Sequence, residues 1–204
     1  MNLQDRADNY NNTFSKWPPV HVEGRWLYGV WMIGNNYRSR QGYHGEYPAT
    51  YLNRIHALFP DAKRVLHLFS GMVDIGRWPE EITLDQSSDT QPDVLCNVEK
   101  RDWMEKVLLA GDKGEFDLVL ADPPYSEEDA QKYGVSLIHR NVVLKDTRSV
   151  VKPSGHLVWL DQVYPMWTKR DWQAMGTIGI WRSTNHRFRG CTIFERNCDE
   201  LAGV

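Results

Sequence analysis

The sequence predicts an α/β protein built on a doubly wound, mostly parallel sheet. Short apolar runs of strand length alternate with stretches of helical length along the chain. The runs end at Gly, Pro, Asp or other polar residues, which interrupt regular structure. At 204 residues the chain is long enough for one well-buried domain and too short for two domains with separate cores.

The first half supplies the centre of the predicted sheet. Three short runs are strand candidates: residues 64–69, 81–85 and 93–96. A helix is expected over 99–110, followed by a polar turn at 111–114. Residues 116–121, with the sequence FDLVLA, then form a nearly continuous apolar run. Such a run is typical of a central strand covered on both faces.

The second half continues the alternation. A helix over about 136–151 is expected to end at the turn Lys152-Pro153-Ser154-Gly155. The elements expected after this turn are a strand at 156–160, a helix near 166–175, a strand at 177–182, a loop at 183–190 and a last strand at 191–196. We expect the last two strands to form a hairpin, which makes the C-terminal strand antiparallel.

The chain divides into three predicted parts: a polar N-terminal extension with a substrate or cofactor loop at 1–45, a core at 46–197 and a tail at 198–204. Its apolar runs are far too short to cross a bilayer, and the first twenty-five residues lack the pattern of a secretory signal. We therefore expect a cytoplasmic protein. Cys96, Cys191 and Cys198 are odd in number and lack zinc-site spacing, so we expect reduced thiols and no metal.

The most informative motif is Asp122-Pro123-Pro124-Tyr125, directly after the run 116–121. Ligands of such sheets bind beyond the carboxyl ends of the strands. Two consecutive prolines fix φ and remove two donors, so the loop presents carbonyl oxygens beside the Asp122 carboxylate. These acceptors can bind both N–H groups of an exocyclic amine and turn its lone pair toward a methyl donor, while Tyr125 offers a ring for stacking an extruded base. The alternative is an ordinary proline-rich turn with a capping acid.

A second set of residues suits a cofactor. Phe69-Ser70-Gly71 ends the strand at 64–69 in a small-residue turn, where a ligand can approach the backbone closely. Asp85 ends the next strand, where an acid can accept both hydroxyls of a ribose. The alternative for Asp85 is a simple turn residue at a strand end.

These motifs resemble those of the amino-methyltransferases that modify adenine N6 or cytosine N4 in DNA. The resemblance covers about Glu46 to Arg196 and includes a proline-led helix from Tyr47 to Ile55. The chain is also similar to small phage and bacterial methylases that lack a separate recognition domain, through residues 66–71, 121–126 and 184–187. The resemblance implies a Rossmann-like methyltransferase sheet with S-adenosyl-L-methionine as cofactor. The residues it implies for cofactor binding are Leu68, Phe69, Ser70, Gly71, Asp85, Asn97 and Pro48.

The sequence departs from the family pattern at three points. Val73 stands where a second glycine is expected after Gly71. The segment 70–80 is short for a parallel crossover, so we expect the usual helix there to be reduced to a loop or one turn. Asn97 stands where the family often has an acid at the adenine ring, although an Asn can also hydrogen-bond an adenine edge.

Substrate recognition is expected from loops, because no segment is long enough for an independent recognition domain. The candidates are basic and aromatic residues in two loops: Tyr37, Arg38, Arg40, His186, Arg187 and Arg189. The expected partner is nucleic acid, with DNA as the leading choice. A net charge of −3 is unusual for such a partner, but residues 169–189 carry five Arg and Lys residues against one acid. One basic face is therefore the expectation, and a solvated surface is the alternative.

Several functions fit these motifs. The leading one is DNA adenine-N6 methylation dependent on S-adenosyl-L-methionine. The alternatives are methylation of a base in structured RNA, methylation of glutamine in a protein, and a catalytically silent subunit with the same fold. The glutamine-methylating family typically begins its loop with Asn rather than Asp. The intact loop at Asp122 argues against a silent subunit, while the altered cofactor turn argues for it.

Overall fold

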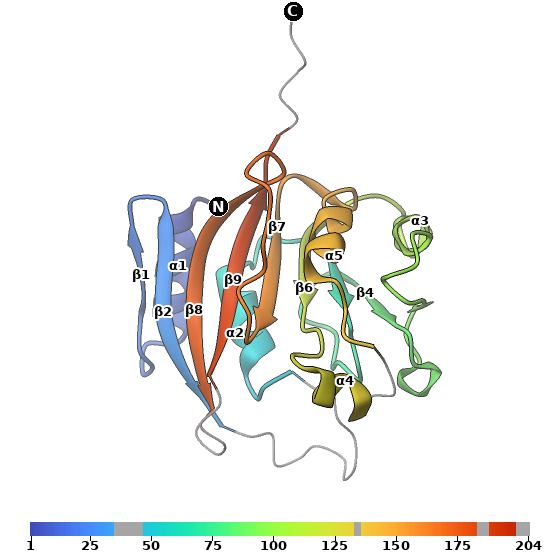
Figure 1. Cartoon of the computed structure of the whole chain (residues 1–204). Helices are drawn as coiled ribbons and strands as arrows, with labels where there is room; N and C mark the ends of the chain where they lie inside the picture. Colours follow the sequence, from blue (N-terminus) through green and yellow to red (C-terminus); the bar gives the residue numbers. More distant parts are fainter. Residues whose placement is uncertain (35–46, 133–135, 183–187, 199–204) are drawn as a thin grey trace, which may run out of the picture.

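In the computed structural model, residues 1–34, 47–132, 136–182 and 188–198 are described (Figure 1). Their strands are β1 (Val20–Glu23), β2 (Trp26–Ile33), β3 (Arg64–Leu68), β4 (Glu80–Asp85), β5 (Val94–Leu95), β6 (Phe116–Ala121), β7 (Val151–Asp161), β8 (Trp172–Arg182) and β9 (Phe188–Arg196). Their helices are α1 (Leu3–Thr13), α2 (Tyr51–Leu58), α3 (Trp103–Leu109), α4 (Glu127–Lys132) and α5 (Arg140–Thr147), with a short 3-10 helix η1 (Ser88–Thr90).

The strands form one sheet in the order β1-β2-β8-β9-β7-β6-β3-β4-β5. Strands β3 to β7 run parallel to one another, and β8 and β2 run in the same direction. Strand β9 is antiparallel to both of its neighbours, β7 and β8. The predicted mixed sheet, mostly parallel with an antiparallel C-terminal strand, is confirmed.

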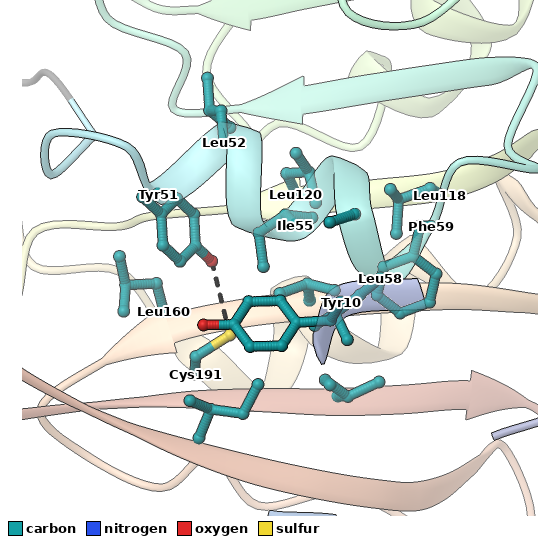
Figure 2. Close-up of a cluster of buried hydrophobic side chains, with 14 of the residues drawn as sticks. Tyr10, Tyr51, Leu52, Ile55, Leu58, Phe59, Leu118, Leu120, Leu160 and Cys191 are labelled. Carbon is teal, nitrogen blue, oxygen red and sulfur yellow. Dashed lines mark hydrogen bonds between the residues drawn. The ribbon is translucent and has the colours of Figure 1, made fainter. Parts of the chain in front are cut away.

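Helices cover both faces of this sheet, as expected for a doubly wound arrangement. Alternate residues of β6 show the division, because Leu118 and Leu120 belong to the core cluster of α1 and α2. Val119 and Ala121 belong to the cluster that contains residues of α3 and α5. Figure 2 shows part of the first cluster, where side chains of α2 lie over the sheet: Tyr51, Leu52, Ile55 and Leu58.

The connection between β3 and β4 contains no helix, as the short spacing predicted. Its backbone amides are bound by the buried carboxylate of Glu81. Oxygen Oε1 of Glu81 accepts hydrogen bonds from the amides of Gly76 at 2.6 Å, Arg77 at 2.6 Å and Trp78 at 3.0 Å. Oxygen Oε2 lies 2.9 Å from Nε2 of His67 in β3. One side chain thus replaces the hydrogen bonds that a helix would supply.

The N-terminal part contributes secondary structure to the sheet. Helix α1 and the β1–β2 hairpin lie within residues 1–45, and β2 pairs in parallel with β8. Leu27, Trp31 and Ile33 of β2 are buried in the cluster that includes α1. The sheet therefore extends two strands beyond β8.

Three expectations about the second half are wrong. The helix near 166–175 is absent, because β8 begins at Trp172. The Trp172 side chain is buried against Phe194 and donates from Nε1 to the Leu144 carbonyl at 3.1 Å, and these contacts suit an extended backbone. The turn at 152–155 lies inside β7 as an irregularity, with Ser154 at φ 60°. Strand β9 begins at Phe188, so it includes residues expected in a loop.

Two predicted helices are shorter than expected, and α2 covers Tyr51–Leu58 instead of 47–55. Helix α3 covers Trp103–Leu109 instead of 99–110, and α5 covers Arg140–Thr147 instead of 136–151. Cys96, Cys191 and Cys198 are free thiols. Within the described ranges, no helix is both long and apolar enough to span a membrane.

Candidate active site

Among the described residues, the predicted site residues that follow β3, β4, β5 and β6 lie where these parallel strands end. The carboxyl ends of parallel strands meet at one edge of a sheet, which lies at the bottom of Figure 1, beside α4. Leu68 is paired with Ala121, so the turn after β3 and the loop after β6 leave the sheet from adjacent positions. Asp85 is the last residue of β4, which pairs with β3, so it lies beside the turn that follows β3.

The turn after β3 is tied to the end of β4. Asp85 Oδ2 accepts a hydrogen bond from the Gly71 amide at 2.9 Å, and Oδ1 accepts one from the Ser87 amide at 2.9 Å. Gly71 has φ 54°, a left-handed conformation that favours glycine, and Phe69 has φ 57°. Left-handed backbone at a residue other than glycine is uncommon and concentrates at ligand-binding segments.

Asn97 lies just after β5, and Pro48 lies just before α2. Asn97 comes two residues after β5, and its Oδ1 accepts a hydrogen bond from the Glu99 amide at 2.8 Å. This Asx turn leaves the amide NH₂ of the side chain as a donor group. Pro48 is buried just before α2, and its carbonyl accepts from the Tyr51 amide at 3.0 Å.

Within the loop after β6, the Tyr125 hydroxyl donates a hydrogen bond to Oδ1 of Asp122. Burial and the Asp122 charge raise the pKa of Tyr125 well above its usual value, so the hydroxyl stays neutral and remains a donor. Ser126 follows, and its Oγ accepts from the Asp129 amide at 3.1 Å. Ser126 therefore caps the N-terminal end of helix α4.

Two more tyrosines belong to the surroundings of Asp122. Tyr47 stacks on Tyr51 with 5.3 Å between ring centroids, and its buried hydroxyl has no hydrogen-bond partner among the described residues. Burial raises the pKa of both well above the usual value, and the Asp122 charge adds to the effect. The hydroxyl oxygen of Tyr51 lies 3.6 Å from Sγ of Cys191, and a dashed line marks this contact in Figure 2. The carboxylate thus has neutral hydroxyls nearby.

Arg189 approaches the loop from strand β9. Its guanidinium carbon lies 4.3 Å from the centroid of the Tyr125 ring, in a cation-π contact. The side chain is buried, and its Nε has no hydrogen-bond partner among the described residues. The structure thus brings this predicted substrate residue to the loop Asp122–Tyr125. The other predicted substrate residues lie outside the described ranges: Tyr37, Arg38, Arg40, His186 and Arg187.

Two residues at the loop were not predicted from the sequence. Asp161 is the last residue of β7, and Arg140 is the first residue of α5. The Arg140 side chain lies between Asp161 and the loop, and its Nε is 2.6 Å from Oδ2 of Asp161. Nη2 of Arg140 donates to the Tyr125 carbonyl at 2.9 Å. An acid directly after the predicted strand at 156–160 was a usable indication, as it was for Asp85. No local pattern identifies Arg140, whose partners are distant in the sequence.

No protein-family model matches the chain, and no curated protein matches it. Among solved structures, it is similar to the N-methyltransferase NodS from Bradyrhizobium japonicum, with a TM-score of 0.41 and 11% identity over 67% of this chain and 87% of that one. It is similar to TrmN from Thermus thermophilus, with a TM-score of 0.45 and 13% identity over 74% of this chain and 49% of that one.

A further likeness is to a putative class I S-adenosylmethionine-dependent methyltransferase from Listeria monocytogenes, with a TM-score of 0.38 and 14% identity over 70% and 56% of the two chains. NodS is also known in complex with S-adenosyl-L-homocysteine. Because every one of these TM-scores is below 0.5, the function proposed below depends on the geometry of the site itself.

Proposed function

We propose that the chain is an S-adenosyl-L-methionine-dependent methyltransferase that acts on the exocyclic amine of a base in DNA, with adenine N6 as the target atom. The observation that carries the proposal is the position of the loop Asp122–Tyr125. It follows β6 directly, and β6 pairs with β3, which leads into the turn Phe69–Gly71. An acidic, acceptor-rich loop thus starts beside a turn suited to the cofactor.

The residues at this edge fit the proposed cofactor. Each oxygen of Asp85 uses one lone pair on a backbone amide, so the carboxylate retains acceptor capacity for the two ribose hydroxyls. The NH₂ group of Asn97 can donate to a ring nitrogen of adenine. Gly71, without a side chain, allows close approach to the backbone. When bound, S-adenosyl-L-methionine supplies an electrophilic methyl group on a sulfonium sulfur.

In this proposal, the Asp122 carboxylate and the Pro123 carbonyl accept hydrogen bonds from the two N–H groups of the target amine. This orientation directs the nitrogen lone pair toward the methyl carbon. With the cofactor bound, these groups would hold the nitrogen so that it takes the methyl group from the sulfonium sulfur, which would keep the electrons of the broken carbon–sulfur bond, and one amine proton would pass to water. Asp122 stabilises the positive charge that develops on nitrogen.

Tyr125 holds the base in this proposal. Arg189 covers one face of the Tyr125 ring, so an extruded base would stack on the other face. The Tyr125 hydroxyl, bonded to Asp122, links the stacking ring to the catalytic carboxylate. Base binding and amine orientation are therefore coupled through one side chain.

The test is to incubate the purified protein with methyl-labelled cofactor and separate pools of DNA, RNA and protein. We expect label in DNA, on adenine N6. Label found only in RNA, or only on glutamine in protein, would show that the substrate is that class of molecule and not DNA. Cofactor binding without transfer to any pool would favour a silent subunit.

A further inference from the structure

Arg140 contacts both the catalytic loop and the end of the next strand. Its Nη2 lies 2.9 Å from the Tyr125 carbonyl oxygen and 3.5 Å from that of Pro124. Its Nε donates to Oδ2 of Asp161 at 2.6 Å, and Nη2 lies 3.3 Å from Oδ1. One planar guanidinium therefore connects the loop after β6 to the end of β7.

Asp161 is held rigidly in place. The residue is only 2% exposed, and its carboxylate accepts hydrogen bonds from Nε1 of Trp159 at 3.2 Å. The amides of Gln162 at 2.7 Å and Val163 at 3.1 Å also donate to it. A buried charge that is paired and hydrogen-bonded in this way has little freedom to move. Arg140, bound to it through two nitrogens, is fixed in turn.

The contacts of Arg140 restrict the torsions that the prolines leave free. In Pro123 and Pro124 the ring fixes φ, so ψ decides where each carbonyl oxygen points. Hydrogen bonds from Arg140 to the carbonyls of Pro124 and Tyr125 restrict ψ at both residues. These bonds hold two loop carbonyls toward Arg140 and leave the Pro123 carbonyl to serve the amine.

The pairing with Asp161 also matters for charge. A target amine gains positive charge as it is methylated, and an uncompensated guanidinium nearby would oppose that change. The Asp161 carboxylate offsets the Arg140 charge at hydrogen-bond distance. Arg140 can therefore hold the loop without raising the electrostatic cost of the reaction.

We propose that Arg140 and Asp161 are positioning residues for the catalytic loop, which set its carbonyls so that Asp122 and Pro123 face the amine. This rests on the function proposed above. A purely structural role is the competing explanation, and the chain offers a matched control for it. Arg148, at the other end of α5, pairs with Asp171 at 3.2 Å, and both side chains are partly buried.

The experiment compares Arg140→Lys and Asp161→Asn with the control Arg148→Lys, in the full chain. Lysine keeps the charge at position 140 but cannot contact Asp161 and two carbonyls with a planar group. We expect kcat for DNA to fall by about tenfold to a hundredfold in both loop variants, as misplaced catalytic groups do. Affinity for S-adenosyl-L-homocysteine should change less than about twofold, and Arg148→Lys should match the wild type in both readouts.

A second readout does not depend on turnover. With 3-fluorotyrosine placed at position 125 alone, the ¹⁹F resonance should shift or broaden in Arg140→Lys and stay unchanged in Arg148→Lys. An unchanged resonance and kcat in Arg140→Lys would overturn the proposal. If the wild type methylates none of the pools, the proposed function fails, and the ¹⁹F comparison still decides whether Arg140 positions the loop.

Discussion

The guanidinium carbon of Arg189 lies 4.3 Å from the centroid of the Tyr125 ring. Strand β9 thus covers one face of the residue that we propose stacks on the target base. Both the position and the electrostatics of the ring depend on this contact, because a cation over one face changes how the other face binds a base.

Replacing Arg189 with Ala should weaken binding of DNA. The Tyr125 ring would lose the side chain that fixes one of its faces, so part of the stacking energy of about 1–3 kcal/mol should be lost, which we expect to raise Kd by roughly two- to tenfold. Fluorescence anisotropy with a labelled duplex measures it. The control is Arg25→Ala, which also removes one positive charge. Arg25 contacts Gln173 at the opposite edge of the sheet, away from the loop. Equal losses in the two variants would mean that only overall charge matters.

Replacing Tyr125 with Phe should lower kcat by about tenfold, because the hydroxyl donates to the Asp122 carboxylate and hydrogen bonds to charged groups are among the stronger ones. Tyr125→Ala should lose this bond and the stacking ring, and so should also weaken DNA binding by about 1–3 kcal/mol. Steady-state kinetics on the two variants separates the effects. A Phe variant as active as the wild type would show that the hydroxyl has no catalytic part.

Replacing Asp85 with Ala should reduce affinity for S-adenosyl-L-homocysteine by a few kcal/mol, since two charge-assisted hydrogen bonds to the ribose would be lost. Isothermal titration calorimetry measures the change. Asp89→Ala is the control, because Asp89 is an exposed acid in η1, close to Asp85 in the sequence. Unchanged affinity in Asp85→Ala would assign the ribose to another acid.

The centre of the sheet could be predicted because its apolar runs stop at clear interruptions. The strand at Phe116–Ala121 has the predicted bounds, and β3 and β4 agree within one residue at each end. The loop Asp122–Tyr125 was predicted as a candidate site for a related reason, since its residue types are unusual at the end of such a run. Local sequence was sufficient for these features.

Pairings between distant segments could not be predicted. Strand β2 lies beside β8, almost 150 residues away in the sequence, and the apolar run at residues 26–33 was the available indication of a strand. The contact of Arg140 with Asp161 depends on how α5 is placed against β7. The segment that begins at Trp172 is extended because the Trp172 side chain packs against Phe194 and donates to the Leu144 carbonyl. Local sequence patterns do not show these contacts.

The Glu81 carboxylate should make folding stability depend on pH. Burial acts against its ionisation, but hydrogen bonds from His67 and from the amides of Trp78 and Gly76 outweigh it and lower its pKa to about 2. Its contribution, about 3 kcal/mol, should be complete above pH 4.5 and disappear as the pH falls from 4.5 to about 2, because the unfolded chain binds the proton first.

Urea unfolding of the wild type and of Glu81→Gln at a series of pH values tests this. The difference in unfolding free energy should be largest near neutral pH and should shrink below pH 4.5. A difference that stays constant down to the acid range would mean that the carboxylate charge does not stabilise the β3–β4 connection.

The most direct measurement of the central claim compares Asp122→Ala with the wild type in two assays, methyl transfer to DNA and calorimetric binding of S-adenosyl-L-homocysteine. If Asp122 orients the amine and stabilises its developing charge, turnover should fall by about a hundredfold or more while the Kd for the cofactor product changes only a few fold. A variant that methylates DNA at the wild-type rate would contradict the account.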